Sequence, residues 1–212
     1  MSTTTDAHYR RTAEARFTAD QRKTTTLLFG GLTWKHDRLI HAGLEGLGYR
    51  CRPLPVPDVR AFQIGKEYGN NGQCNPTYFT VGNLVKHLQE LAAAGKSREE
   101  ILRDHVFFTA GACGPCRFGM YESEYRLALR NAGFEGFRVL LFQQSAGLSQ
   151  SDVEDGLAMN LDFFMTILNA ISIGDLLNEV AYQIRPYEVR PGETDRVMGE
   201  IMDDLAAVMR DK

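Results

Sequence analysis

The sequence predicts an α/β fold, in which a parallel sheet flanked by helices is followed by a C-terminal helical extension. Three observations predict it. Short apolar runs rich in β-branched residues end at glycine or proline, stretches with apolar residues at helical spacing separate them, and the pattern becomes wholly helical after Ser151. Strands that alternate with helices form parallel sheets covered on both faces, and such sheets bind ligands outside the carboxyl ends of their strands.

The first strand is expected within residues 24–32, because TTTLLFGGL is apolar and β-branched and ends at glycines. Leu39, Ile40, Leu44 and Leu47 then recur at helical spacing up to Gly48, which predicts a helix. Residues 49–57 alternate again and end in prolines, which predicts a second strand. These elements form one β-α-β unit.

The middle of the chain continues the alternation. A helix is expected over residues 76–91, with Pro76 in its first turn, where proline is favoured, and Gly95 after its end. Ser97 and Glu100 have the spacing of a capping box and open a short helix. A buried strand over residues 105–112, a helix over 118–131 and a strand over 137–144 follow.

Beyond Ser151 three helices are expected. Their apolar residues predict one long helix that stops at Gly174, a second from Leu176 to Ile184, and a third from Val197 to Val208. The expected organisation is therefore a flexible arm or linker remnant at residues 1–23, an α/β domain at 24–150 and a helical extension at 151–212 that packs on it.

Composition excludes several classes of protein. The 212 residues include 24 Lys and Arg against 27 Asp and Glu, and a net charge of −3 is not that of a nucleic-acid-binding protein. No continuous run approaches the roughly 18 apolar residues of a membrane helix, and residues 1–23 lack the apolar core of a secretory signal. We therefore expect a cytoplasmic protein that binds neither nucleic acid nor membrane, with its four cysteines reduced.

The cysteines carry the strongest functional pattern. Cys113 and Cys116 frame the sequence Cys-Gly-Pro-Cys, which lies directly after an expected strand and before an expected helix, and Cys74 also lies immediately before a helix. Unpaired amides and the positive end of the helix dipole stabilise a thiolate at a helix start. Several soft, anionic sulfur ligands suit zinc or an iron–sulfur cluster rather than calcium or magnesium.

Only three of the cysteines are placed to act together. Zinc sites and iron–sulfur clusters usually take four ligands, and Cys51 lies within an expected strand, where a buried structural thiol is the favoured interpretation. Three ligands on a cubane cluster would leave one iron open to substrate or to a bridging ligand.

A competing interpretation needs only two cysteines. Cys-Gly-Pro-Cys at a helix start is also the motif of thioredoxin-type dithiol oxidoreductases. Against it, the residue before the first cysteine is Ala112 rather than an aromatic, at least two β-α units precede the motif, and Cys74 has no role.

Other polar residues near these cysteines are weaker candidates. Gln143, Gln144 and Ser145 end an expected strand at the same edge of the sheet and are candidates for substrate contact. Arg117 and Asn75 directly follow cysteines and are candidates to tune a bound cluster. No Walker-type phosphate-binding sequence occurs, so the chain is not expected to bind ATP itself.

Four segments together resemble a known family: Gly65-Lys66-Glu67-Tyr68, Gln73-Cys74-Asn75-Pro76-Thr77, Gly111 to Tyr121 (GACGPCRFGMY), and Arg185-Pro186-Tyr187-Glu188. From about Thr24 to Asp195 the chain resembles the 2-hydroxyacyl-CoA dehydratase family, most closely the dehydratase-like region of the large activase-related proteins, and it is also similar to double-cubane cluster proteins. The cysteine-containing segments are the specific part of this likeness.

The resemblance implies a Rossmann-like domain that holds an iron–sulfur cluster through Cys74, Cys113 and Cys116. In the dehydratases this is a 4Fe-4S cluster with an open iron, which passes one low-potential electron to a 2-hydroxyacyl-CoA thioester; in the double-cubane proteins two subunits share an 8Fe cluster. In both groups an ATP-dependent, homodimeric activase with its own 4Fe-4S cluster supplies the electron. Typical members carry two such α/β domains, whereas this chain has room for one, so a homodimer or a partner dehydratase-like domain is expected.

Three hypotheses follow. The first is an iron–sulfur component of a reductive or radical enzyme, with the cluster on Cys74, Cys113 and Cys116. The second is a dithiol oxidoreductase that uses only Cys113 and Cys116. The third is a non-enzymatic module, with zinc or without metal, that docks partners through its helical tail.

Overall fold

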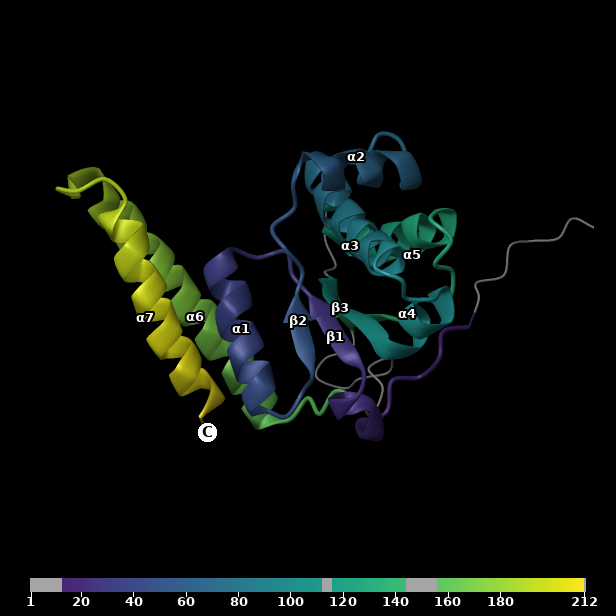
Figure 1. Cartoon of the computed structure of the whole chain (residues 1–212), viewed down its shortest axis with the longest axis horizontal. Helices are drawn as coiled ribbons and strands as arrows, with labels where there is room; N and C mark the ends of the chain where they lie inside the picture. Colours follow the sequence, from purple (N-terminus) through teal and green to yellow (C-terminus); the bar gives the residue numbers. More distant parts are fainter. Residues whose placement is uncertain (1–12, 112–115, 144–155, 212) are drawn as a thin grey trace, which may run out of the picture.

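Four parallel strands form the centre of the molecule, in the order β2-β1-β3-β4 (Figure 1). The computed structural model describes residues 13–111, 116–143 and 156–211. The strands are β1 (Thr26–Phe29), β2 (Cys51–Pro53), β3 (His105–Gly111) and β4 (Val139–Gln143), and every neighbouring pair is parallel. Helices cover both faces of this sheet, which confirms the predicted α/β, Rossmann-like class.

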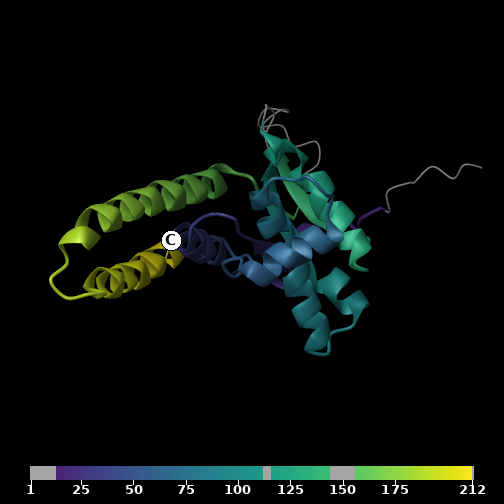
Figure 2. The same ribbon diagram turned by 90° about the horizontal axis from the view of Figure 1, so that it is seen from above.

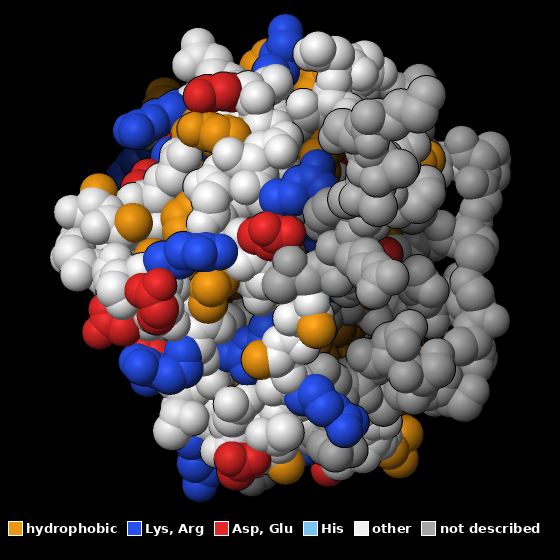
Figure 3. All heavy atoms as spheres, turned by 90° about the vertical axis from the view of Figure 1, so that its right-hand side faces the viewer, with side chains coloured by type: hydrophobic (Ala, Val, Ile, Leu, Met, Phe, Trp, Pro, Cys, Tyr) orange, Lys and Arg blue, Asp and Glu red, His pale blue; other side chains and the backbone are white. Residues whose placement is uncertain are grey.

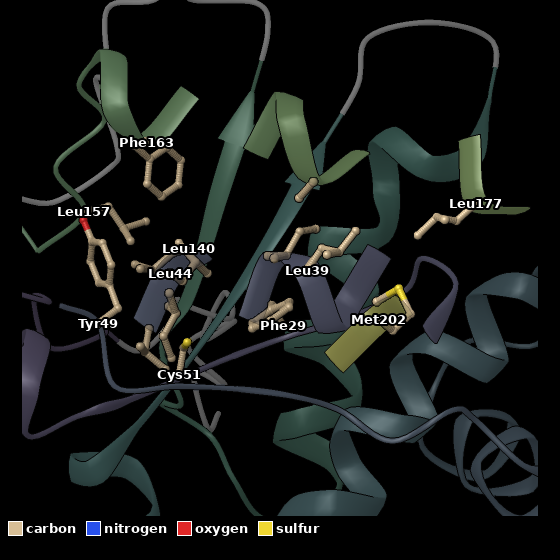
Figure 4. Close-up of a cluster of buried hydrophobic side chains, with 14 of the residues drawn as sticks. Phe29, Leu39, Leu44, Tyr49, Cys51, Leu140, Leu157, Phe163, Leu177 and Met202 are labelled. Carbon is tan, nitrogen blue, oxygen red and sulfur yellow. The ribbon is translucent and has the colours of Figure 1, made fainter. Parts of the chain in front are cut away.

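Side chains alternate along the strands and so build two cores. Leu27 and Phe29 point into one core, whereas Leu28, between them, points into the other. In the first core, Figure 4 shows Phe29, Leu39 and Leu140 converging with Phe163 and Leu177, which come from late in the chain. Because both faces of the sheet are buried, its strands are apolar on both sides, as in other parallel sheets.

The second core lies under five helical segments: α2 (Val59–Tyr68), α3 (Asn75–Ala93), α4 (Arg98–Asp104), the 3-10 turn η2 (Arg117–Met120) and α5 (Tyr121–Asn131). The sequence analysis missed α2, although Asp58 caps it by accepting a hydrogen bond from the Ala61 amide at 2.8 Å. Helices α2 and α3 approach so closely that a Cβ atom on Gly82 would lie 1.8 Å from the Ala61 carbonyl oxygen. Only glycine fits there.

The other face is covered by α1 (Trp34–Gly46), α6 (Leu161–Ile184) and α7 (Glu193–Arg210). Helices α6 and α7 form an antiparallel hairpin, joined through the 3-10 turn η4 (Arg185–Tyr187), that extends away from the sheet (Figure 2). The predicted stop at Gly174 is wrong, because α6 continues through it. A Cβ atom on Gly174 would lie 2.2 Å from Cδ2 of His36, so this glycine permits close packing of α6 on α1.

Helix α6 begins later than predicted, at Leu161, where Asn160 caps it by accepting a hydrogen bond from the Phe163 amide at 3.0 Å. The residues directly after Ser151, where this helix was expected to begin, lie outside the described residues. One face of α6 is buried and carries Phe163, Ala170, Leu177 and Ala181, whereas Leu161, Met165, Leu168 and Leu176 are exposed.

Among the described residues, one segment, Leu161–Tyr187, is long and apolar enough to cross a membrane. The core helix of a soluble protein meets the same two criteria, so this helix argues only weakly for a membrane span. The segment contains Asp162 and Asp175 and is therefore not a continuous apolar run of the kind sought in the sequence.

The first described residues pack onto the sheet. Phe17 is fully buried in the first core, and its carbonyl accepts a hydrogen bond from the Gly156 amide at 3.0 Å. The Glu14 carboxylate pairs with Arg126 at 2.7 Å and accepts from the amide of Val139 in edge strand β4 at 3.0 Å. Residues 19–23 form the 3-10 helix η1 (Ala19–Lys23). Thus residues 13–23, which the sequence analysis assigned to the flexible arm, are part of the folded body; residues 1–12 lie outside the described ranges.

Acidic and basic side chains are interspersed on the side of the molecule that carries α4 and α5 (Figure 3). Helices α4 and α5 each carry an ion pair: Arg103 contacts Asp104 at 2.7 Å, and Arg126 contacts Glu122 at 2.6 Å.

Asp37, in the first turn of α1, is expected to make stability depend on pH. Burial raises its pKa from 3.8 to about 6, against the opposing effects of His36 and the Leu32 backbone, and its Oδ1 atom is buried without a hydrogen-bond partner. The folded chain therefore binds this proton more tightly than the unfolded chain, so its stability rises as pH falls from about 6 towards 3.8.

Asp37→Asn removes this titration. After allowance for partial exposure, we expect the variant to exceed the wild type in free energy of unfolding by roughly 1–2 kcal/mol at neutral pH, and this advantage to vanish near pH 4. Urea unfolding of both proteins at the two pH values measures the difference. A difference that does not change with pH would contradict the assignment.

Candidate functional site

The site lies at the carboxyl edge of the sheet, where the strand order reverses. From β1 the chain crosses to β2 on one side, and β3 then returns to the opposite side of β1, so β1 and β3 are neighbours at a topological switch point. Open α/β sheets bind ligands at such a point. The Cys113–Cys116 segment follows β3 directly, and both α3 and α5 begin at this edge of the sheet.

Cys74 is the N-cap residue of α3, immediately before Asn75 and Pro76 in its first turn. Its half-buried Sγ lies 3.0 Å from the Thr77 hydroxyl oxygen and 3.6 Å from the Tyr121 hydroxyl oxygen, both within hydrogen-bond distance for sulfur. Asn75, a candidate from the sequence, lies at the first helical position and is exposed. The hydroxyls nearest the sulfur thus belong to Thr77 and Tyr121.

Cys116 is the N-cap residue of η2, which runs directly into α5, and it is exposed. Burial raises the pKa of Tyr121 above its ordinary value, and the charges of both Cys74 and Cys116 add to this rise. Tyr121, on the helix that follows Cys116 in the chain, is thus the residue of α5 whose hydroxyl lies against the Cys74 sulfur.

The remaining candidates cannot all be compared in this way. Cys113, Gln144 and Ser145 lie outside the described residues. For Arg117, at the start of η2, and Gln143, at the end of β4, only the backbone positions are described; these are at the expected edge of the sheet. The described ranges, which lack Cys113, contain no group of three or more His, Cys, Asp or Glu side chains that could hold a metal ion.

Cys51 lies apart from this site. It is buried in the first core on β2, next to Tyr49 and Leu44 (Figure 4), and its Sγ points to the carbonyl oxygen of His41 at 3.6 Å. Burial raises the pKa of its thiol to about 12, so the thiol stays protonated near neutral pH. Its burial in the first core agrees with the structural role that the sequence analysis favoured.

Sequence reasoning missed the residues that hold the turn before Cys74. Glu124 of α5 is buried and accepts hydrogen bonds from the backbone amide and side chain of Asn70 and from the side chain of Gln73. The signal was present in the sequence: Glu124 is the one charged residue among the buried positions of α5, which otherwise include Tyr125 and Ala128. A carboxylate on the buried face of a helix needs a hydrogen-bonding role.

Comparison of the chain with protein-family models, with curated proteins and with solved structures finds no match. Cys74, at the start of α3 and beside two hydroxyl groups, lies where a thiolate is stabilised, and the thiolate is the form of cysteine that binds soft metals or attacks disulfides.

Proposed function

We propose that this chain is an iron–sulfur protein of the 2-hydroxyacyl-CoA dehydratase type, in which Cys74, Cys113 and Cys116 hold the cluster. The observation that carries the proposal is the approach of Cys74, at the start of α3, to Tyr121, which opens the helix that directly follows Cys116 and η2. A dithiol enzyme would need no cysteine from the start of α3. A site that binds one inorganic centre through sulfur from two chain segments requires such an approach.

The donor set fits a cluster. Cys74 lies at the start of α3 and Cys116 at the start of η2, and the Thr77 and Tyr121 hydroxyls are placed to donate to the Cys74 sulfur. Hydrogen bonds to ligand sulfur tune the reduction potential of iron–sulfur clusters. When bound, a cluster on three cysteines would supply one-electron chemistry at low potential and an iron open to a further ligand. It could be a 4Fe-4S cluster or half of an 8Fe cluster shared between two subunits.

Anaerobic reconstitution tests the proposal. We expect about four iron and four sulfide per chain, and an electron paramagnetic resonance signal after reduction that metal-free protein lacks. Protein that stays free of iron under strict anaerobiosis and still reduces disulfides would contradict it. Zinc found after aerobic purification decides nothing, because zinc also occupies vacated cysteine sites.

Tyr121→Phe is expected to lower the reduction potential of the cluster by about 30–60 mV, since loss of one hydrogen bond to a ligand sulfur disfavours the more negative, reduced form. A redox titration followed by electron paramagnetic resonance measures the shift. Tyr125→Phe is the matched control: Tyr125 lies one turn further along α5 and is buried in the second core. Equal potentials in the two variants would contradict the role of Tyr121.

The proposal includes partners. An ATP-dependent activase with its own 4Fe-4S cluster would supply the electron, and a second copy or a partner dehydratase-like domain would complete the active site. The oxygen sensitivity of such a cluster suits an anaerobic cytoplasm, where the four cysteines of the chain would be kept reduced. Gln143, the last residue of β4, and Gln144 and Ser145, which follow it in the sequence, are the proposed residues for substrate contact.

The second candidate is a dithiol oxidoreductase. The exposure of Cys116 at the start of η2 favours it, because an attacking thiol has to be accessible. This enzyme would depend on Cys113 and Cys116 and would keep its disulfide reductase activity when Cys74 is replaced.

A further inference from the structure

The turn that precedes Cys74 is held from two sides. On one side, the Tyr78 hydroxyl of α3 accepts a hydrogen bond from the Gln73 amide at 2.9 Å and donates to the Asn70 carbonyl at 3.0 Å. On the other side, the Glu124 carboxylate of α5 accepts from the Asn70 amide at 3.2 Å, from the Asn70 side chain at 2.7 Å and from the Gln73 side chain at 3.1 Å. Both ends of the turn are therefore bonded to helices.

The Glu124 side chain is well suited to this task. Glu124 is only 4% exposed. Its Oε1 atom accepts two of the three hydrogen bonds and its Oε2 atom accepts the third. Hydrogen bonds to a charged acceptor are stronger than those between neutral groups, and a buried carboxylate that lost them would be costly. The carboxylate and the turn therefore keep each other in place.

The position of Glu124 on α5 links it to the second cysteine segment. Tyr121, three residues earlier, lies on the same side of the helix and places its hydroxyl 3.6 Å from the Cys74 sulfur. The same helix continues the η2 turn that starts at Cys116. One short, continuous helical stretch thus follows Cys116 and carries both the phenol beside Cys74 and the carboxylate that holds the backbone before Cys74.

We propose that Glu124 is a positioning residue that sets the distance between Cys74 and Cys116, by tying the Asn70–Gln73 turn to the helix that follows Cys116. The cluster-related part of this inference rests on the proposed function. The placement of Cys74 does not, since it can be measured on metal-free protein.

Glu124→Gln is the decisive variant, because glutamine keeps the size of the side chain but replaces one acceptor oxygen by a donor that faces the Asn70 or Gln73 donors. In reduced, metal-free protein we expect iodoacetamide to alkylate Cys74 about tenfold faster in the variant, with the rate at Cys116 unchanged. Peptide mass spectrometry reads the two rates separately. After reconstitution we expect iron to be held on the order of 10–100-fold more weakly, with altered g-values in the reduced protein.

Glu122→Gln is the matched control. Glu122 lies on the same turn of α5 and pairs with Arg126 at 2.6 Å, on the side of the helix towards Glu14 and β4. We expect both alkylation rates and the spectrum to match the wild type. Asn70→Ala, at an exposed position of the turn, removes one bond without touching the core and is expected to accelerate alkylation of Cys74 about threefold.

The outcomes separate the two proposals. Alkylation of Cys74 that is equally fast in wild type, Glu124→Gln and Asn70→Ala overturns the positioning role, whatever the iron content. Faster alkylation at Cys74 alone supports it even if the wild type binds no iron, in which case only the proposed function fails. Equal acceleration at Cys74 and Cys116 indicates general loosening of the site and also overturns the specific role.

Discussion

Cys74→Ala is expected to abolish iron binding, from about four iron per chain to less than one. The variant removes one of three proposed ligands and leaves an incomplete site, whereas the core is preserved because the Cys74 side chain is only half-buried at a helix start. Iron and sulfide analysis after anaerobic reconstitution measures the loss, and circular dichroism verifies that the protein is folded.

Cys51→Ala is the control for this variant. It also removes one thiol, but from the core, and should cost roughly 1 kcal/mol of stability while leaving the iron content unchanged. Iron retained by Cys74→Ala and lost in Cys51→Ala would overturn the ligand assignment. Disulfide reductase activity that persists in Cys74→Ala, without iron in the wild type, would favour the dithiol enzyme.

Gly82→Ala is expected to destabilise the fold by about 3 kcal/mol or more, although alanine is normally the better helix former by about 1 kcal/mol. The new methyl group would lie 1.8 Å from the Ala61 carbonyl oxygen and 2.5 Å from the Gly65 amide nitrogen, and both are backbone atoms that cannot rotate away. Helix α2 would have to separate from α3. Urea unfolding followed by circular dichroism measures the change.

Gly199→Ala tests the same substitution without the clash. Gly199 lies in the interior of α7, and a Cβ atom there would meet nothing within 4 Å. We expect this variant to gain about 0.5–1 kcal/mol. If both variants shift stability in the same direction, the close crossing of α2 and α3 is not the reason for the glycine.

Periodicity predicted those parts of the fold in which neighbouring residues decide the structure. Strand β3 and helix α3 lie where their apolar patterns place them, because each buries a face that local spacing defines. The helix end predicted at Gly174 was wrong because this glycine serves a tertiary contact. Glycine usually marks a helix end, but here it admits the ring of His36 from α1, and no local pattern shows which helix will pack against it. Helix α2 was missed because its apolar pattern is short.

The candidate site was predictable for cysteines that directly precede an expected helix at the carboxyl edge of the sheet. Cys74 and Cys116 lie at helix starts on the carboxyl edge of the sheet, as their flanking patterns indicated. The roles of Tyr121 and Glu124 were not identified, because they depend on the approach of α5 to the turn at Asn70–Gln73. Glu124 lies more than fifty positions after this turn in the sequence. Contacts of that separation follow from the topology rather than from local spacing.

The contact between Phe17 and Gly156 constrains how the chain folds during synthesis. The Arg22 side chain also bonds to the Gly156 carbonyl, at 2.6 Å and across 134 positions, and Leu157 packs in the same core as Phe17. A nascent chain on the ribosome therefore cannot complete the first core until residue 157 has emerged. Until then Leu27, Phe29 and Leu39 are not yet buried by the residues from late in the chain that share this core. The growing polypeptide is therefore a candidate client for chaperones that bind exposed apolar segments.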